Sequence, residues 1–244
     1  TGCAVCGADD FREILRREAL PILQNVVYPS REEALASPVA PFALSICAKC
    51  GFGFNSEFDA SLMVYDERYD NEVPSEAFLR YYREVASRLA QEFLRQGGVV
   101  YEVGCGKGTF LDVLLEAAPG ATAVGVDPTC APRESSRLRI RQQAFSADSL
   151  EGRPDLIVCR HVLEHIPTPL RFLTDIGAAV SGYGEVPIYL EVPDLHWILE
   201  HGAFWDFCYE HCNYFTPASL AIALDRAGYR VAVAGLSFGS QYQW

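Results

Sequence analysis

From about residue 98 onward, the alternation of apolar and polar positions divides the chain into strand-like and helix-like stretches. The apolar run VVYEV leads into a glycine-rich turn, GCGKG, and then into the helical pattern TFLDVLLEAA. A second strand-like run, AVGVD, ends at Asp127, and a later one, DLIVC, covers residues 155–159. Strand, turn, helix and strand in this order predict a nucleotide-binding α/β unit with a parallel sheet.

The stretch before the first of these strands has a helical period. Ser75 is a suitable N-cap, and a pair of glycines at 97 and 98 ends the pattern. The apolar side chains that recur at helical spacing are Phe78, Tyr82, Val85, Leu89 and Phe93. Such an aromatic stripe belongs to a core more often than to a ligand site, although four tyrosines could edge a cleft: Tyr65, Tyr69, Tyr81 and Tyr82.

Residues 1 to about 60 are rich in Cys, Pro and Gly and predict a small β unit with short apolar strands such as PFALSI. Two Cys-x-x-Cys hooks stand in this stretch, formed by Cys3 with Cys6 and by Cys47 with Cys50. Four thiolates can close tetrahedrally on one Zn²⁺, and the glycine after each hook suits a tight knuckle. Because four protein ligands leave no open position, we expect a structural zinc in preference to two disulfides or four buried thiols.

These patterns divide the chain into three consecutive stretches without repeats or low-complexity linkers. We expect a zinc-binding unit over residues 1–60, a helical bridge over residues 61–98 and a core over residues 99–244. The expected fold class is α/β, with a doubly wound, Rossmann-like core beside the small zinc-binding β unit.

The amino-acid composition limits the kinds of binding partner and the cellular compartment that we expect for this protein. The net charge is −12 and no long basic stripe occurs, which argues against nucleic-acid binding. The one local exception, RESSRLRIR at residues 133–141, predicts a solvated loop or helix face. Five further cysteines are scattered, and neither a signal peptide nor an apolar run of membrane-spanning length is evident. We therefore expect a cytoplasmic protein without a membrane partner.

The glycine spacing in the turn distinguishes two cofactors. Gly104, Gly106 and Gly108 allow the backbone to turn sharply and approach a ligand at the N-terminus of the next helix. Dinucleotide-binding folds favour G-x-G-x-x-G, whereas here Glu102 precedes Gly-x-Gly-x-Gly, with Cys105 inside the turn. This arrangement resembles the first motif of class I S-adenosylmethionine (SAM) methyltransferases, so SAM is the expected cofactor and NAD the second choice.

Further cofactor contacts are expected after the other strands. Asp127 can accept hydrogen bonds from ribose hydroxyls, and Asp148 stands where an adenine could be read. Arg160 and His161 open the stretch RHVLEHIPTPLRFL, which closely resembles the post-strand segment of the same superfamily. His161 and His165 either line the cofactor cleft or cap and pack the junction between strand and helix.

Zinc hooks followed by these motifs resemble a zinc-containing methyltransferase family that includes the sugar C-methyltransferases of deoxysugar pathways. The resemblance spans nearly the whole chain and is most specific in FWDFCYEHCNYFTPASLAIALDRAGY, where Glu210 and His211 match the family's Glu-His pair at the substrate pocket. The sugar enzymes carry a tyrosine three positions before the histidine, whereas this chain has Cys208 there and Tyr209 one place later. The family also implies a third domain, and SQYQW supplies only the beginning of a closing hairpin strand, as expected of a core truncated at its C-terminus.

C-methylation requires that a carbon nucleophile lose a proton before it takes the methyl group of SAM. We expect His211 to be the base, Glu210 to orient a hydroxyl, and Tyr209 or Tyr214 to hydrogen-bond a developing enolate oxygen. The alternative is that Glu210 and His211 only pin their loop to the sheet.

The expected function is C-methylation of a small sugar-like or keto substrate, for which a nucleotide-linked sugar is one candidate. Two alternatives remain open: O- or N-methylation of a small metabolite, and a non-catalytic zinc-stapled scaffold that binds SAM.

Overall fold

The computed structural model describes residues 2–64 and 75–244, so Tyr65, Tyr69 and that part of the expected bridge lie outside the described residues. The chain divides into two compact units, and each is assembled from separate segments. Unit 1 comprises Thr1–Asn71, Leu163–Thr174 and Val192–Trp244, and unit 2 comprises Glu72–Val162 and Asp175–Glu191. The sequence predicts consecutive stretches, whereas residues far apart in the chain pack together in both units.

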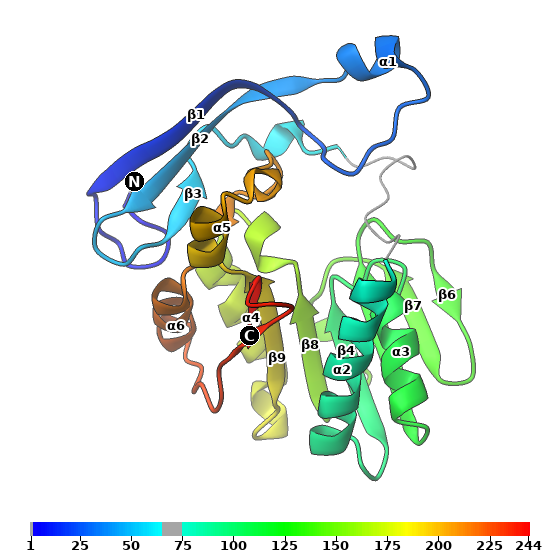
Figure 1. Cartoon of the computed structure of the whole chain (residues 1–244). Coiled ribbons are helices and arrows are strands. Elements are labelled where there is room, and N and C mark those ends of the chain that lie inside the picture. Colours follow the sequence, from blue (N-terminus) through cyan, green and yellow to red (C-terminus); the bar gives the residue numbers. More distant parts are fainter. Residues whose placement is uncertain (1, 65–74) are drawn as a thin grey trace. The chain divides into compact units, whose positions relative to one another are not determined.

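Unit 1 is built on an antiparallel sheet with the strand order β1-β2-β3-β10. The two longest strands form an extended ribbon (Figure 1). The strands are β1 (Phe11–Pro21), β2 (Val39–Cys47), β3 (Gly53–Asn55) and β10 (Asn213–Tyr214). The predicted strand PFALSI lies within β2, so this strand is confirmed.

Short helices complete unit 1. Its apolar core joins β2 to the first of the C-terminal helices through Phe42, Leu44, Leu195 and Ile198, all fully or almost fully buried. The α-helices are α1 (Arg31–Leu35), α5 (Leu195–His201) and α6 (Pro217–Arg226), and the 3-10 turns are η1 (Ala60–Leu62), η3 (Leu163–His165) and η5 (Phe204–Asp206). The closing hairpin that the sequence predicts is present as β11 (Leu236–Ser237) and β12 (Tyr242–Gln243), and β12 pairs with Val192 and Pro193.

Unit 2 contains the parallel sheet that the sequence predicts. Its strand order is β9-β8-β4-β5-β7, with the short β6 antiparallel at the edge. The strands are β4 (Gly98–Val103), β5 (Ala121–Asp127), β6 (Arg133–Glu134), β7 (Leu138–Gln142), β8 (Leu156–Arg160) and β9 (Ile188–Pro193), the last of which ends in unit 1. Chain order runs outward in both directions from β4, so the sheet is doubly wound, and its switch point lies at the carboxyl ends of β4 and β8.

Helices α2 (Glu76–Phe93) and α3 (Thr109–Ala117) lie side by side in front of the strands in Figure 1. The Ser75 cap is confirmed, since its hydroxyl accepts a hydrogen bond from the Phe78 N–H group at 3.2 Å. The predicted aromatic and aliphatic stripe of α2 faces inward, with Val85 and Leu89 buried. Helix α4 (Pro169–Val180) contributes residues to both units, and unit 2 also holds η2 (Ala147–Ser149) and η4 (Ser181–Tyr183).

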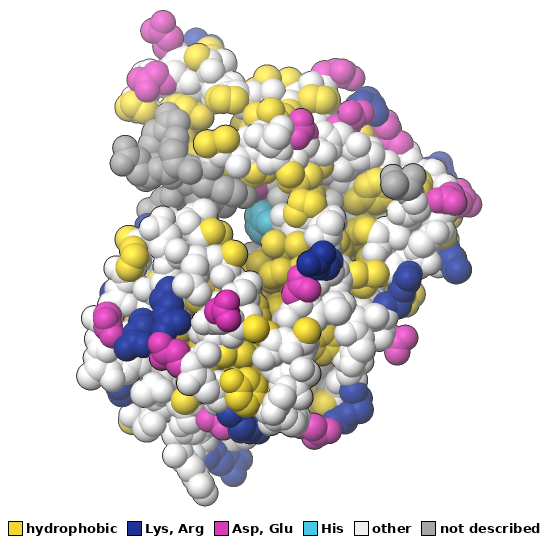
Figure 2. All heavy atoms as spheres, turned by 180° about the vertical axis from the view of Figure 1, so that it is seen from behind, with side chains coloured by type: hydrophobic (Ala, Val, Ile, Leu, Met, Phe, Trp, Pro, Cys, Tyr) yellow, Lys and Arg dark blue, Asp and Glu magenta, His cyan; other side chains and the backbone are white. Residues whose placement is uncertain are grey.

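The basic run at residues 133–141 forms β6 and β7, so the expectation of a loop or helix face was wrong. The reason is the period of two at its end: Leu138 and Ile140 are buried, while Arg139 pairs with Glu134 at 2.9 Å. In Figure 2, basic and acidic side chains are interspersed over the face that the view presents. Among the described residues, no helix has both the length and the apolar character needed to cross a bilayer.

Candidate functional site

The glycine turn connects β4 to α3 at the carboxyl edge of the parallel sheet. Gly104, Gly106 and Gly108 have φ values of 70°, 51° and 85°, in the left-handed region that favours glycine. A Cβ atom at Gly104 would come within 2.2 Å of Val162, and one at Gly108 within 2.2 Å of Ile140. Gly108 is the N-cap of α3 and provides no side-chain cap, so the N-terminus of this helix adjoins the glycine turn, as in anion-binding helix termini.

Asp127 ties the turn to the end of β5. Its carboxylate accepts hydrogen bonds from the Gly106 N–H group at 3.0 Å and from the N–H and hydroxyl groups of Thr129 at 2.8 and 2.7 Å. Each carboxylate oxygen has two lone pairs, so further acceptor capacity remains for a ligand hydroxyl. Among the other predicted residues, Glu102 is buried in β4, and Asp148 is exposed in η2.

Arg160 and His161 contact a buried carboxylate, Glu191, that the sequence interpretation missed. Glu191 accepts hydrogen bonds from Arg160 Nε at 3.1 Å and from the Tyr189 hydroxyl at 2.7 Å, and its Oε1 lies 3.0 Å from His161 Nε2. The Tyr81 hydroxyl also donates to it. Burial alone would raise the pKa of Glu191, but the charge of Arg160 and the contacts with His161 and Tyr81 hold the pKa well below its ordinary range.

The Arg160 guanidinium also lies over two aromatic rings. Its central carbon is 4.3 Å from the centre of the Phe110 ring and 4.5 Å from that of Tyr82. His161 adopts a φ of 53°, a value that is uncommon for a residue with a Cβ and that is found repeatedly at functional sites. The signal for this network was present in the sequence as one acidic residue, Glu191, inside the otherwise apolar strand IYLEVP.

A second group of polar residues lies in unit 1. One carboxylate oxygen of Glu164 and one ring nitrogen each of His165 and His211 lie within 4.8 Å of one another. The two imidazole rings meet edge to face, with their centres 4.8 Å apart. His165 Nδ1 lies 3.2 Å from the carbonyl oxygen of Glu210, and His211 Nδ1 lies 3.1 Å from that of Asp206. We call Glu164, His165 and His211 the histidine cluster.

The residues after His211 anchor the turn that carries the rest of the cluster. The Cys212 thiol donates to the Glu164 carbonyl at 3.4 Å. The Asn213 side-chain amide donates to the carbonyls of Leu163 at 3.0 Å and Ile166 at 2.6 Å. These hydrogen bonds join residues 212–213 to residues 163–166, so the two segments that form the cluster are linked to each other.

The Glu210 side chain contacts Gln24 and lies near His165. Its Oε1 accepts a hydrogen bond from the Gln24 N–H group at 2.7 Å, and its Oε2 lies 4.0 Å from His165 Nδ1. Cys208, at the position where the sugar enzymes have tyrosine, is buried, and burial together with the charge of Glu210 raises the pKa of its thiol. Cys208 is therefore a neutral thiol at physiological pH.

The two tyrosines expected beside the histidine are held by backbone groups. The Tyr209 hydroxyl accepts from the Asp59 N–H group at 2.8 Å and donates to the Glu57 carbonyl at 3.3 Å, and the residue is fully buried. The Tyr214 hydroxyl lies 3.3 Å from the Asp206 carbonyl, and burial raises its pKa well above the ordinary value. Both rings thus join the packing of unit 1.

The four hook cysteines also come together. Cys3 Sγ lies 3.7 Å from Cys50 Sγ, and Cys6 Sγ lies 3.5 Å from Cys47 Sγ, so each short contact joins one hook to the other. All four sulfur atoms lie within 4.8 Å of one another, and none is in a disulfide. Zn–S bonds of about 2.3 Å place tetrahedral sulfurs about 3.8 Å apart, which these separations fit.

The knuckle geometry around the cysteines agrees with that fit. Gly7 and Gly51 have φ values of 77° and 72°, as the tight turns after the hooks require. The N–H groups of Val5 and Cys6 lie 3.4 and 3.5 Å from Cys3 Sγ, where they can stabilise a thiolate. Arg226 of α6 donates to the Val5 carbonyl at 2.7 Å and anchors the first hook.

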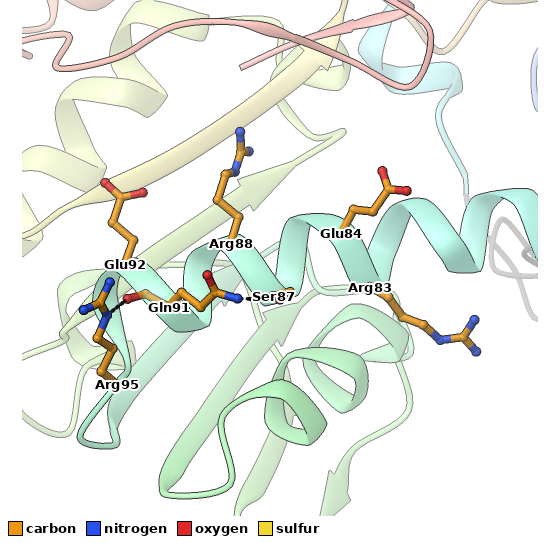
Figure 3. A pocket seen from close by; sticks show the side chains of 7 residues that line it. All are labelled: Arg83, Glu84, Ser87, Arg88, Gln91, Glu92 and Arg95. Carbon is orange, nitrogen blue, oxygen red and sulfur yellow. Dashed lines mark hydrogen bonds between the residues drawn. The ribbon is translucent and has the colours of Figure 1, made fainter.

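A depression of about 740 Å³ lies along the outer face of α2 in unit 2 and contains none of the predicted site residues. Figure 3 shows that its side chains come from a single helix and the residues just after it: Arg83, Glu84, Ser87, Arg88, Gln91, Glu92 and Arg95. Ligand pockets are concave and mostly apolar, whereas this surface is lined by charges of both signs. We interpret it as the solvated face of an amphipathic helix.

Comparison with known proteins gives one family match. A family model described as a methyltransferase domain matches residues 75–233, more than half of the chain. A ubiquinone biosynthesis O-methyltransferase from Histophilus somni is 28% identical over 121 residues, covering 43% of this chain and 48% of the relative. The chain thus spans about half the length of the curated relatives it matches.

Solved structures share the fold. An N,N-8-amino-8-demethyl-D-riboflavin dimethyltransferase from Streptomyces davawensis has a TM-score of 0.54 at 23% identity and covers 68% of this chain and 53% of its own. A 1,6-didemethyltoxoflavin-N1-methyltransferase from Burkholderia thailandensis, solved with S-adenosylhomocysteine, has a TM-score of 0.50 at 19% identity, covering 66% of this chain and 75% of its own. At these identities the likeness concerns the fold.

Proposed function

Because the chain belongs to the methyltransferase domain family, we propose that it transfers a methyl group from SAM to a small organic acceptor. The observation that carries the proposal is the turn of three left-handed glycines at the carboxyl end of β4, tied by Gly106 to Asp127. Dinucleotide folds place a longer glycine spacing at this edge. A structural neighbour solved with S-adenosylhomocysteine supports the choice of cofactor.

In this proposal, SAM supplies an electrophilic methyl group on its sulfonium sulfur. Asp127 accepts hydrogen bonds from the ribose hydroxyls, and the glycine turn allows the backbone to approach the ligand closely. Asp148 contacts the adenine, and Arg160 and His161 border the same edge of the sheet, held in place by Glu191.

His211 is the proposed base. If His211 Nδ1–H donates to the Asp206 carbonyl at 3.1 Å, the lone pair of its ring is on Nε2, where it can accept a proton. His165 lies against this ring and donates in the same way to the Glu210 carbonyl. A neutral imidazole with its proton on Nδ1 has its lone pair on Nε2, which is the arrangement that general-base catalysis needs.

For the acceptor, we propose a small keto or sugar-like molecule that is methylated on carbon next to a carbonyl group. The resemblance to sugar C-methyltransferases supports this choice, although Cys208 replaces the tyrosine of those enzymes. The second candidate is methylation of a hydroxyl oxygen, which the O-methyltransferase relative favours. The same base serves both reactions, because each acceptor must lose one proton.

We also propose that Cys3, Cys6, Cys47 and Cys50 hold one structural Zn²⁺. The separations across the two hooks and the positive φ of both knuckle glycines support it. Four protein ligands leave no position for substrate, so this metal would stabilise unit 1 without taking part in methyl transfer.

The test of the function is transfer of label from methyl-labelled SAM to a panel of keto sugars, hydroxylated small molecules and amines. Product analysis distinguishes the bond that forms: C-methyl for the first candidate and O-methyl for the second. Tight SAM binding without transfer to any acceptor class would instead support the non-catalytic scaffold.

A further inference from the structure

We propose that the histidine cluster, Glu164, His165 and His211, binds a divalent transition-metal cation that is separate from the zinc of the cysteine hooks. One oxygen of Glu164 and one nitrogen of each imidazole lie within 4.8 Å of one another, so a small movement brings all three to a common centre. Two imidazoles and one carboxylate suit zinc and its first-row neighbours, and they leave coordination positions open.

The backbone contacts of the two rings support the proposal. A histidine that ligates a metal almost always donates its second N–H group to a carbonyl or carboxylate, which sets the tautomer and the orientation of the ring. Here Nδ1 of His165 faces the Glu210 carbonyl at 3.2 Å, and Nδ1 of His211 faces the Asp206 carbonyl at 3.1 Å. Both rings therefore direct the nitrogen lone pair of Nε2 away from the backbone.

The burial and anchoring of Glu164 add a second, independent observation. Glu164 is only 2% exposed, and a carboxylate next to two imidazoles in such a buried position is a donor set that suits a cation. Cys212 and Asn213 directly follow His211 in the chain. Their hydrogen bonds to the turn that carries Glu164 and His165 hold that turn at a fixed distance from His211. The three groups are thus positioned before any cation binds, and pre-positioning lowers the cost of binding.

One consequence rests on the proposed function. Cation binding and proton acceptance use the same lone pair of His211, so each excludes the other. The cation-loaded protein should therefore lose methyl transfer, and removal of the cation by a chelator should restore it. The bound cation would act as a reversible inhibitor of the enzyme.

The probe is Co²⁺, titrated into the purified protein. Nitrogen and oxygen ligands give cobalt only weak visible bands, whereas thiolate ligands add intense charge-transfer bands in the near ultraviolet, so the spectrum reports which cluster is filled. We expect weak bands from one Co²⁺ in addition to any metal held by the cysteines. In His165→Asn and in Glu164→Gln, Co²⁺ affinity should fall by about tenfold or more.

His201→Asn is the matched control, because His201 also has Nδ1 against a backbone carbonyl, that of Trp197 at 3.0 Å, but is exposed and distant from Glu164 in the chain. Its Co²⁺ affinity should be unchanged. Equal affinity in the parent, His165→Asn and Glu164→Gln, or thiolate bands alone, would overturn the cation site. Weak bands with undiminished methyl transfer would keep the cation site and remove His211 from its role as base.

Discussion

Two histidines only four positions apart in the chain have opposite environments. His161 of unit 2 contacts the Glu191 carboxylate, which also accepts hydrogen bonds from Arg160 and from two tyrosine hydroxyls. His165 of unit 1 has its Nδ1 against a backbone carbonyl and its ring against His211. The Glu191 carboxylate accepts hydrogen bonds from several side chains around it, whereas Nδ1 of His165 and Nδ1 of His211 face backbone carbonyls.

The difference shows why residue type alone does not identify a reactive histidine. A buried ionic network resists a change of protonation, because the loss of one charge leaves the opposite charge buried without compensation. An imidazole whose Nδ1 faces a backbone carbonyl can bind a proton or a cation at Nε2 while that contact is kept. We therefore propose that Arg160, His161 and Glu191 position the site and stabilise unit 2, and His211 remains the proposed base.

The largest expected effect is the loss of stability when one of the four hook cysteines is replaced. This substitution tests whether unit 1 depends on a metal site with four protein ligands, in addition to the histidine cluster. Cys47→Ser should lower the zinc content from one per chain and reduce the free energy of unfolding by more than about 5 kcal/mol, since one lost thiolate opens the site. Elemental analysis and thermal unfolding measure this. Cys130→Ser, at a buried cysteine of unit 2, should keep the metal. A Cys47→Ser protein with full zinc and an unchanged melting temperature would contradict the zinc proposal.

The second prediction tests whether the buried network around Glu191 stabilises the fold. Glu191→Gln leaves Arg160 buried without its counter-charge, and it should reduce the free energy of unfolding by about 3–5 kcal/mol in denaturant titrations. Glu134→Gln is the control, because Glu134 forms an exposed pair with Arg139 and should contribute less than about 1 kcal/mol. Equal losses in the two variants would show that the buried network is not the stabilising element.

The third prediction tests the proposed role of His211 as the base. His211→Asn should lower methyl transfer by about a hundredfold or more while SAM affinity and unfolding stay unchanged, because the cofactor turn belongs to unit 2. With a keto substrate and S-adenosylhomocysteine in D₂O, the parent should exchange the α-proton and the variant should not. His201→Asn should match the parent. Exchange at equal rates in parent and His211→Asn would make His211 a structural residue.

The fourth prediction concerns the cofactor turn next to the Glu191 network. Asp127→Ala removes the acceptor of the Gly106 N–H group and of the proposed ribose hydroxyls, so SAM affinity should fall by about 1–3 kcal/mol in calorimetry. Asp112→Ala, at an exposed carboxylate paired with Arg133, should leave the affinity unchanged. Unchanged SAM binding in Asp127→Ala, or tight NADH binding by the parent, would favour the dinucleotide cofactor.

The smallest effect appears only in acid. The pKa of Glu191 is lower in the folded protein than in the unfolded chain, so its contribution is complete above the unfolded value of about 4.3. It is lost as the pH falls from there toward the folded pKa. The free energy of unfolding should therefore fall more steeply below about pH 4 in the parent than in Glu191→Gln. Parallel pH curves would mean that the pKa of Glu191 is the same in the folded protein and in the unfolded chain.

Much of the fold followed from local patterns. The strand before the glycine turn, the Ser75 cap and the doubly wound order are present as expected. The error at residues 133–141 arose because the abundance of arginine was given more weight than the alternation of Leu138 and Ile140. For the candidate site, the sequence indicated the cysteines and the glycine turn, but neither Glu191, despite its place in an apolar strand, nor Glu164 was among the predicted site residues.

The sequence by itself determined whatever depends on neighbouring residues: the left-handed glycines of the turn, the cysteine hooks and the periods of strands and helices. Only the tertiary structure decided which side chains meet across long separations. Glu191 accepts a hydrogen bond from Arg160, which is 31 residues away in the sequence. The Tyr209 hydroxyl accepts one from the Asp59 N–H group, which is 150 residues away. The physical reason is that backbone dihedrals and periodicity are local, whereas the partner of a buried polar group depends on which distant segment packs against it and satisfies its hydrogen bonds.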